Sequence, residues 1–175
     1  MTEHQPYEVL ERHPGFGLRR YPEHVVADVT VDGSFESAGT SGFRPLVGYI
    51  SRGGVAMTAP VLQQTAAEAE EATSASAYRV SFVMPAGSTV ESLPVPADAR
   101  VTIRQVAAHK AAAAQFSGRW TRGSFRRHAE DLSAAVADAG QSPAGPQRWA
   151  RFEPPRTPWF LRPNEVVQPV HKPQD

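Results

Sequence analysis

The histidines, serines and acidic residues of this chain are not spaced for familiar metal or hydrolytic chemistry. Six histidines are scattered without an H-x-x-x-H or H-x-H pair, which argues against a zinc site. There is no cysteine, and therefore no thiolate nucleophile or thiolate metal ligand. No G-x-S-x-G elbow, P-loop or G-x-G-x-x-G is present. The one acidic cluster, Glu68, Glu70 and Glu71, is typical of a solvated loop.

One predicted helix, residues 34–51, carries more apolar surface than a single core contact requires. Its main apolar stripe consists of Phe35, Gly42, Leu46 and Ile50. At about 100° per residue, Phe43 and Val47 lie beside Thr40, roughly 80–120° round from that stripe. With Thr40 and Arg44 they are the best candidates on this helix for facing a ligand. The alternative is that Phe43 and Val47 pack against a neighbouring strand or loop.

Composition excludes several classes of protein. The 175 residues, 41% of them hydrophobic, suit one domain with a sizeable core. Eighteen Lys and Arg balance 18 Asp and Glu, which argues against a nucleic-acid binder or a polybasic membrane-surface protein. No apolar run approaches the ~20 residues of a membrane span. We expect a soluble, cytoplasmic protein, monomeric or weakly dimeric.

Hydrophobic periodicity predicts an α+β fold with two helices and a largely antiparallel sheet. Period-two alternation predicts strands near 7–10, 16–21, 25–31, 55–64, 78–84, 101–104, 109–116, 148–152 and 164–170. A second helix is expected from a Ser124 cap to a stop at Gly140. Residues 65–77 contain nothing apolar larger than alanine, so they predict a mobile loop, and the tail 171–175 is expected to fray.

An internal repeat accompanies these elements. A shift of 85 residues, without gaps, places Arg19 on Arg104, His24 on His109 and Gly33 on Gly118. Each copy then continues into a helix and returns through strands. The repeat predicts two pseudo-symmetric strand-strand-helix-strand halves joined into one sheet, with a helix from each half packed on its face.

Four separate segments resemble the SOUL haem-binding protein family. They are Tyr7–Glu11 continuing into Phe16–Pro22, the phrase Val55–Val61 that contains M-T-A-P, the triplet Phe116–Gly118, and Glu153–Val166. No single segment is specific. Their order over about residues 7–168 identifies the chain as a member of this family.

The resemblance implies a twisted, barrel-like antiparallel sheet with two helices, forming a single domain over residues 1–175. It also implies a shallow apolar cleft at the first helix for haem or another tetrapyrrole. Burial of the macrocycle would give the affinity. The candidate site residues are Thr40, Phe43, Arg44, Val47, Trp159 and Phe160.

The axial ligand of a haem iron is the point at which this chain departs from relatives. Some relatives carry a histidine, proposed as a ligand, where this chain has Arg20, and a guanidinium has no lone pair to donate. His128 and Met57 are weak alternative ligands. The pair Asn164-Glu165 is expected to be structural, with the glutamate accepting backbone or arginine hydrogen bonds at a strand start.

Three functions follow from these observations. The first is reversible binding of haem or a related tetrapyrrole, for buffering, carriage or sensing, without catalysis. The second is an effector or protein-interaction module of the same fold that does not bind haem. The third is a haem-modifying enzyme, for which the sequence shows no ordered acid.

Overall fold

The computed structural model describes residues 2–66, 77–152, 158 and 161–171. Most of the predicted loop 65–77 and of the tail 171–175 therefore lies outside the described residues. The chain folds into two compact units. Unit 1 comprises Met1–Gln5 and Glu23–Ala107, and unit 2 comprises Pro6–Pro22 and Ala108–Asp175.

Unit 1 is built on a four-stranded antiparallel sheet. Its strands, in spatial order, are β6 (Val61–Thr65), β7 (Ala77–Val83), β4 (His24–Asp32) and β8 (Thr102–Val106). A short parallel pair, β1 (Glu3–His4) with β5 (Thr58–Ala59), belongs to the same unit. Alternation along β4 and β7 places their apolar residues on one face, as the period-two pattern predicts.

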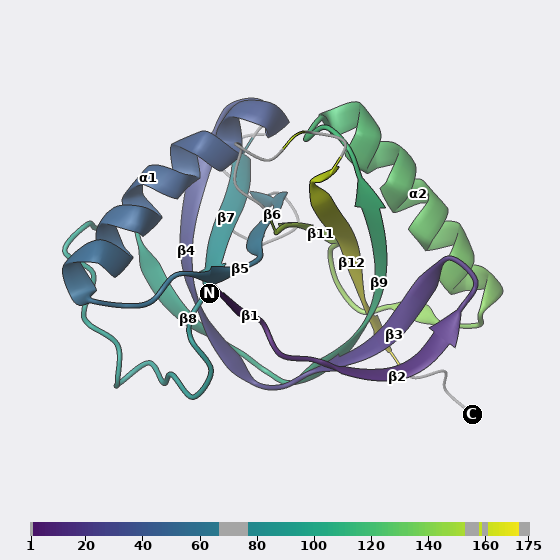
Figure 1. The fold of residues 1–175 in the computed structure, drawn as a ribbon, viewed down its shortest axis with the longest axis horizontal. Helices are drawn as coiled ribbons and strands as arrows, with labels where there is room; N and C mark the ends of the chain where they lie inside the picture. Colours follow the sequence, from purple (N-terminus) through teal and green to yellow (C-terminus); the bar gives the residue numbers. More distant parts are fainter. Residues whose placement is uncertain (1, 67–76, 153–157, 159–160, 172–175) are drawn as a thin grey trace. The chain divides into compact units, whose positions relative to one another are not determined.

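Helix α1 (Phe35–Gly53) covers that apolar face and packs on β4 and β7 (Figure 1). It begins at Ser34, whose hydroxyl accepts the Ser37 backbone N–H, and it ends at Gly54 in the left-handed conformation. The helix approaches the sheet closely at Gly42, where an added Cβ would lie 2.7 Å from the Val80 side chain. Residues from α1, β4 and β7 form the core of the unit, among them Leu46 and Val29.

Unit 2 has a five-stranded antiparallel sheet. Its strands, in spatial order, are β2 (Glu8–His13), β3 (Phe16–Tyr21), β9 (His109–Ser117), β12 (Pro163–His171) and β11 (Arg148–Arg151), and β10 (Ser142–Pro143) also pairs with β12. Helix α2 (Arg122–Asp138) packs on β9, β12 and β3 (Figure 1). Phe125, Leu132 and Val136 form its buried stripe.

The start of α2 differs from the sequence prediction. Thr121, not Ser124, is the N-cap: its backbone is extended, and its hydroxyl accepts the Ser124 backbone N–H at 3.2 Å. Ser124 is therefore the third residue inside the helix. Both residues are good capping types, and the sequence pattern alone could not choose between positions one turn apart.

Consecutive strands of the chain belong to different units. β3 pairs with β9 in unit 2, although it directly precedes β4 of unit 1. β8 pairs with β4 in unit 1, although it directly precedes β9 of unit 2. The 85-residue shift carries β4, at 24–32, onto β9, at 109–117. Each unit is thus completed by a strand that lies next to the other unit in sequence.

The α+β class, with antiparallel strands and two helices packed on them, is confirmed. The single-domain expectation for residues 1–175 stays a prediction. Within the described parts of the chain, no helix is both long and apolar enough to cross a membrane.

Candidate functional site

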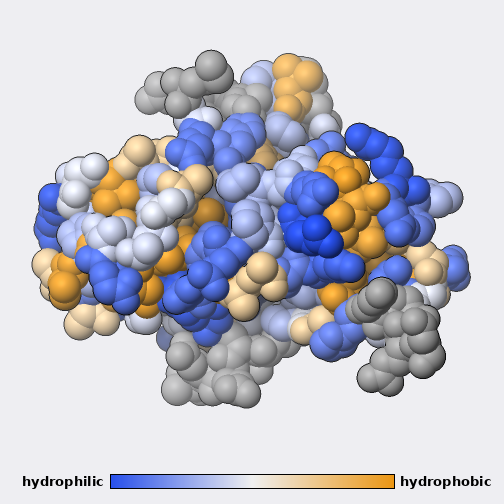
Figure 2. All heavy atoms as spheres, turned by 90° about the horizontal axis from the view of Figure 1, so that it is seen from below, coloured by the Kyte–Doolittle hydropathy of each residue, from blue (hydrophilic) through white to orange (hydrophobic). Residues whose placement is uncertain are grey.

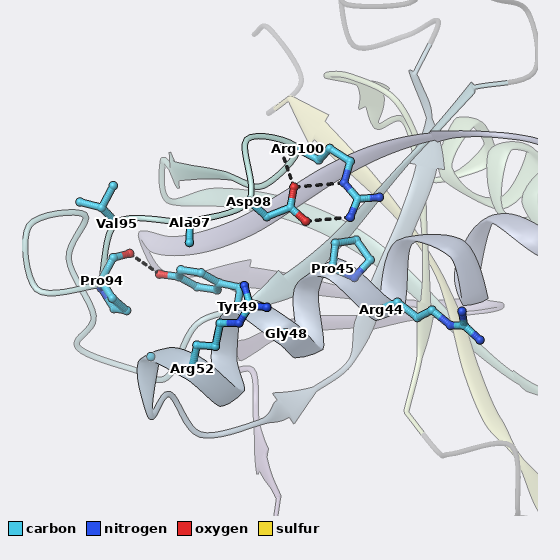
Figure 3. Close-up of a pocket in the computed structure, with 11 residues that line it drawn as sticks. Arg44, Pro45, Gly48, Tyr49, Arg52, Pro94, Val95, Ala97, Asp98 and Arg100 are labelled. Carbon is cyan, nitrogen blue, oxygen red and sulfur yellow. Dashed lines mark hydrogen bonds and ion pairs between the residues drawn. The ribbon is translucent and has the colours of Figure 1, made fainter.

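A cavity of about 320 Å³ lies in unit 1, beside α1. One wall is the helix, through Arg44, Pro45, Gly48, Tyr49, Arg52 and Gly53, and the other is the segment 94–100 (Figure 3). Positions 44, 48 and 52 repeat every four residues, so they form one stripe along α1. The cavity therefore faces a different stripe of the helix from the one that packs on the sheet.

A hydrogen bond joins the two walls of the cavity. The Tyr49 hydroxyl donates to the Pro94 carbonyl oxygen at 2.9 Å (Figure 3). Burial raises the pKa of Tyr49, so the phenol stays protonated at neutral pH. A protonated phenol that donates to a carbonyl is not available as a phenolate ligand for ferric iron.

The charged groups of the cavity are mainly cationic. Arg100 donates to both oxygens of Asp98, at 3.0 and 2.7 Å, and this pairing lowers the pKa of Asp98 to about 2. Among the residues that the structure describes, Arg44 and Arg52 have no ion-pair partner within 4.0 Å. Figure 3 shows the Arg44 side chain extending away from Tyr49, at the edge of the cavity. The lining thus carries three guanidiniums and one carboxylate, which suits an anionic ligand.

The candidate residues of α1 occupy three different environments. Phe43 is 42% exposed, and its ring meets Phe82 edge-on at 5.4 Å between centroids. Val47 is partly buried against the core of unit 1, and Thr40 is exposed. Arg44 is the candidate that lines the cavity. Phe43 and Arg44 therefore lie on adjacent, exposed stripes of α1, whereas Val47 is partly buried against the core of unit 1.

The exposed apolar surface is divided into separate patches. Figure 2 shows hydrophobic residues on the displayed face as several groups separated by hydrophilic ones. The large hydrophobic side chains exposed among the described residues are Tyr7, Val9, Phe43, Val90, Val95 and Leu161. Val95, which is 90% exposed, lines the cavity. Phe43 and Val95 thus provide apolar surface on α1 and on the cavity wall, respectively.

The candidate iron ligands have other roles. Met57 is partly buried against the core of unit 1. His128 lies on α2, where its Nδ1 donates to the Ser124 carbonyl at 2.7 Å and its ring stacks on Phe116 at 3.8 Å. Arg20 is exposed and pairs with Glu8 at 3.3 Å. Within the described parts of the chain, no group of three metal-ligating side chains occurs.

Of the remaining sequence predictions, one is confirmed, and the other concerns two residues that the structure does not describe. Trp159 and Phe160 lie outside the described residues. Glu165 accepts two hydrogen bonds from Arg19, as predicted for it. The sequence analysis did not predict that Arg52, Asp98 and Arg100 line the cavity. The one sequence feature that pointed to this wall was the pair Pro94 and Pro96, which is typical of a loop.

The M-T-A-P segment connects α1 to strands β5 and β6. Thr58 donates its hydroxyl to the Val83 carbonyl, and the Ala59–Pro60 peptide bond is cis. These features fix the path of the chain from β5 into β6. The motif is therefore built into the frame of unit 1, while the cavity lies on α1.

A family model for the SOUL heme-binding protein matches residues 2–169. The chain belongs to this family. The comparison with curated proteins gave no match.

Solved structures with the same fold are distant in sequence. The C-terminal domain of EcmrR is 16% identical, with a TM-score of 0.66, over 95% of this chain and 98% of that one. A protein from Listeria innocua described as a hydrolase is 12% identical, with a TM-score of 0.58, over 88% and 91% of the two chains. SAV2435, solved with tetraphenylphosphonium, is 9% identical, with a TM-score of 0.51, over 89% and 93%. At these identities the likeness shows the fold alone.

Proposed function

We propose that this SOUL family member reversibly binds haem or a related tetrapyrrole on the outer side of α1, as a buffer, carrier or sensor. The observation that carries the proposal is the half-exposed Phe43 ring on the helix that also forms the cationic cavity. A tetrapyrrole combines a flat apolar macrocycle with carboxylates at one edge. Phe43 supplies the apolar contact, and Arg44 and Arg52 supply the partners for carboxylates.

The cavity fits part of the ligand. A tetrapyrrole is larger than the cavity, so one edge would enter between α1 and the segment 94–100 while the rest lies over Phe43. Burying about 300 Å² of apolar surface contributes about 7 kcal/mol, from which association costs several kcal/mol. This balance supports weak, reversible binding, which suits a carrier or sensor better than a permanent prosthetic group.

Iron ligation is not what supports the proposal. The cavity lining holds no imidazole or thioether, and its one phenol donates to Pro94. The residues present therefore fit the macrocycle and its carboxylates rather than the metal. When bound, haem would supply its iron to external ligands, and this chain's residues would hold and orient the macrocycle.

The experiment is a haemin titration followed by the Soret absorbance. We expect saturation near one equivalent, and at least about tenfold weaker binding in Phe43→Glu, a loss of ~1.4 kcal/mol or more. The matched control is Val90→Glu, which changes a side chain of similar exposure (40%) in the same unit that does not line the cavity. Equal affinity in the two variants, both folded by circular dichroism, would overturn the assignment of the site.

A second titration tests the arginines. The double change Arg44→Glu and Arg52→Glu should weaken haemin binding, because it replaces two attractions to carboxylates by two repulsions. Arg126→Glu on α2 is the control, since Arg126 is an exposed helical arginine of unit 2. Charge reversal at Arg126 should leave the affinity unchanged.

The second candidate function is an effector module for a smaller ligand. Its support is the size of the cavity, about 320 Å³, at the lower end of the range for small-molecule sites. The surplus of guanidiniums favours a small anion over a lipophilic cation such as the tetraphenylphosphonium bound by SAV2435. Thermal stabilisation by a small organic anion, with none by haemin or by tetraphenylphosphonium, would favour this candidate.

A further inference from the structure

Glycine is an unusual residue at position 48, inside helix α1. A glycine within a helix costs stability relative to alanine, because its backbone loses more freedom on folding. Close packing explains the glycine at Gly42, where an added Cβ would lie 2.7 Å from Val80, and at Gly53, where it would lie 2.5 Å from the ring of Pro94. At Gly48 an added Cβ would meet nothing within 4 Å, and φ is not positive. Neither packing against the described residues nor backbone conformation therefore requires a glycine there.

Pro45 is a second helix-weakening residue, one turn before Gly48. A proline inside a helix lacks the N–H that would donate to the preceding turn, and its ring crowds that turn. Positions three apart lie on the same side of a helix, and both residues line the cavity between α1 and the segment 94–100 (Figure 3). The helix thus departs from good helix-forming residues at its cavity wall, as expected where a binding site rather than stability determines the residue.

The opposite wall presents an apolar side chain that is left almost fully exposed. Val95 lies between Pro94 and Pro96, and a proline restricts the residue before it to extended conformations. The Val95 side chain lines the cavity and is 90% exposed. The cavity therefore has open space on its helical side, at Gly48, and an apolar contact on its other side.

Gly48 also lies midway between two arginines of the cavity. Arg44 and Arg52 are four residues before and four residues after it, so they flank it on the same stripe of α1. Each is about 6 Å from Gly48 along the helix axis. An anionic group that reached the helix backbone at Gly48 would therefore have a guanidinium on either side.

We propose that Gly48 is the specificity-determining position of the α1 cavity, where the missing side chain lets the anionic edge of a flat ligand reach the helix between Arg44 and Arg52. Val95 contacts the apolar part of that ligand from the opposite wall. The inference rests on the proposed function, because it concerns the same cavity. It adds a requirement for shape, a thin edge, to the requirement for negative charge.

The test compares haemin binding and stability in the same variants. Gly48→Ala should weaken binding about threefold or more, and Gly48→Leu about tenfold or more, because each places carbon atoms where the edge of the ligand would lie. Without ligand, Gly48→Ala should unfold about 1–4 °C higher than the unaltered protein, because it removes a glycine from a helix. Weaker binding together with higher stability is the expected signature, since a purely structural glycine would lower the unfolding temperature when replaced.

Gly123 provides the matched controls, Gly123→Ala and Gly123→Leu. It is also a helical glycine at which an added Cβ would meet nothing within 4 Å, but it lies in α2 of unit 2 and does not line the cavity. Both changes should leave haemin binding unchanged. A lower unfolding temperature in Gly48→Ala, or equal effects on binding at positions 48 and 123, would overturn the role of Gly48.

A second probe separates this inference from the tetrapyrrole proposal. Pyrenesulfonate is a flat aromatic anion without a macrocycle, and its fluorescence anisotropy reports binding. If pyrenesulfonate binds more weakly to Gly48→Leu and haemin does not bind the unaltered protein, the tetrapyrrole proposal fails and the role of Gly48 stands. If both probes bind and neither distinguishes the variants at positions 48 and 123, the role of Gly48 fails and the tetrapyrrole proposal stands. Binding of neither probe to the unaltered protein would overturn both.

Discussion

Arg19 and Glu165 are 146 positions apart in the chain and form a two-pronged ion pair buried on the sheet of unit 2. Tyr7 lies over the Arg19 guanidinium, 3.9 Å from the ring centre to the guanidinium carbon. Burial by itself lowers the pKa of Arg19, but the hydrogen bonds and electrostatic attraction from Glu165 and Tyr21 together outweigh it, so the pKa is raised. The pair links β3, from the start of the chain, to β12, near its end.

Removing the carboxylate of this pair should destabilise the protein strongly. Glu165→Gln leaves the Arg19 charge buried without a partner, which costs about 3–5 kcal/mol. Urea unfolding followed by circular dichroism measures the change. Glu130→Gln on α2, whose contact to Arg126 is exposed and 3.8 Å long, should have no measurable effect. A loss below about 1 kcal/mol in Glu165→Gln would show that water reaches Arg19.

Two glycines of α1 should respond oppositely to alanine. Gly42→Ala places a methyl group 2.7 Å from Val80 and should destabilise the protein by about 1–3 kcal/mol. Gly48→Ala meets nothing within 4 Å and should stabilise it by about 0.5–1 kcal/mol through the lower flexibility of the unfolded chain. Thermal unfolding of the two variants provides the comparison. Destabilisation by both would indicate that the helix-to-sheet distance at Gly42 is not what limits packing.

Asp98 should titrate about two pH units below an ordinary aspartate. Its hydrogen bonds from Arg100 lower its pKa to about 2, so the folded state binds that proton less readily than the unfolded state. The resulting stabilisation is fully present above about pH 4 and is lost as the pH falls toward 2. A carbon NMR titration of the Asp98 carboxyl should show this midpoint, and Arg100→Met should move it upward. An unchanged midpoint in Arg100→Met would contradict the assignment.

Tetrapyrrole binding at α1 should depend little on iron. Because the cavity lining contains no imidazole or thioether, haemin and iron-free protoporphyrin should have dissociation constants within a factor of about three, or ~0.7 kcal/mol. Competition between the two ligands measures the ratio directly. A preference for haemin of a hundredfold, or a low-spin haem spectrum, would show that a side chain of this protein ligates the iron.

Local patterns predicted most of the fold. The strand at 16–21 has the predicted bounds, and each end of β4 and β9 lies within one residue of its predicted position. The agreement is close because period-two alternation identifies the buried face of a strand directly. The two-residue strands β1 and β10 are too short to show a period. The predicted start of α2 was wrong because Ser124 and Thr121 are both plausible N-cap residues.

The candidate site was predicted only on its helical side. Helical spacing distinguished Phe43 from the core stripe, and Phe43 is indeed exposed while Leu46 is fully buried. The opposite wall depends on a contact between Tyr49 and Pro94, 45 positions apart, which no local pattern encodes.

The pairing of β3 with β9 rather than with its neighbour β4 constrains folding during synthesis. The β2–β3 hairpin leaves the ribosome before the other strands of unit 2, and its partner β9 begins only at residue 109. A nascent chain ending at residue 107 would contain every described strand of unit 1 and a hairpin with no sheet to join. The β2–β3 hairpin is therefore made well before its sheet can be completed, and its exposed β3 edge must stay unpaired, or be protected by a chaperone, while about ninety further residues are translated.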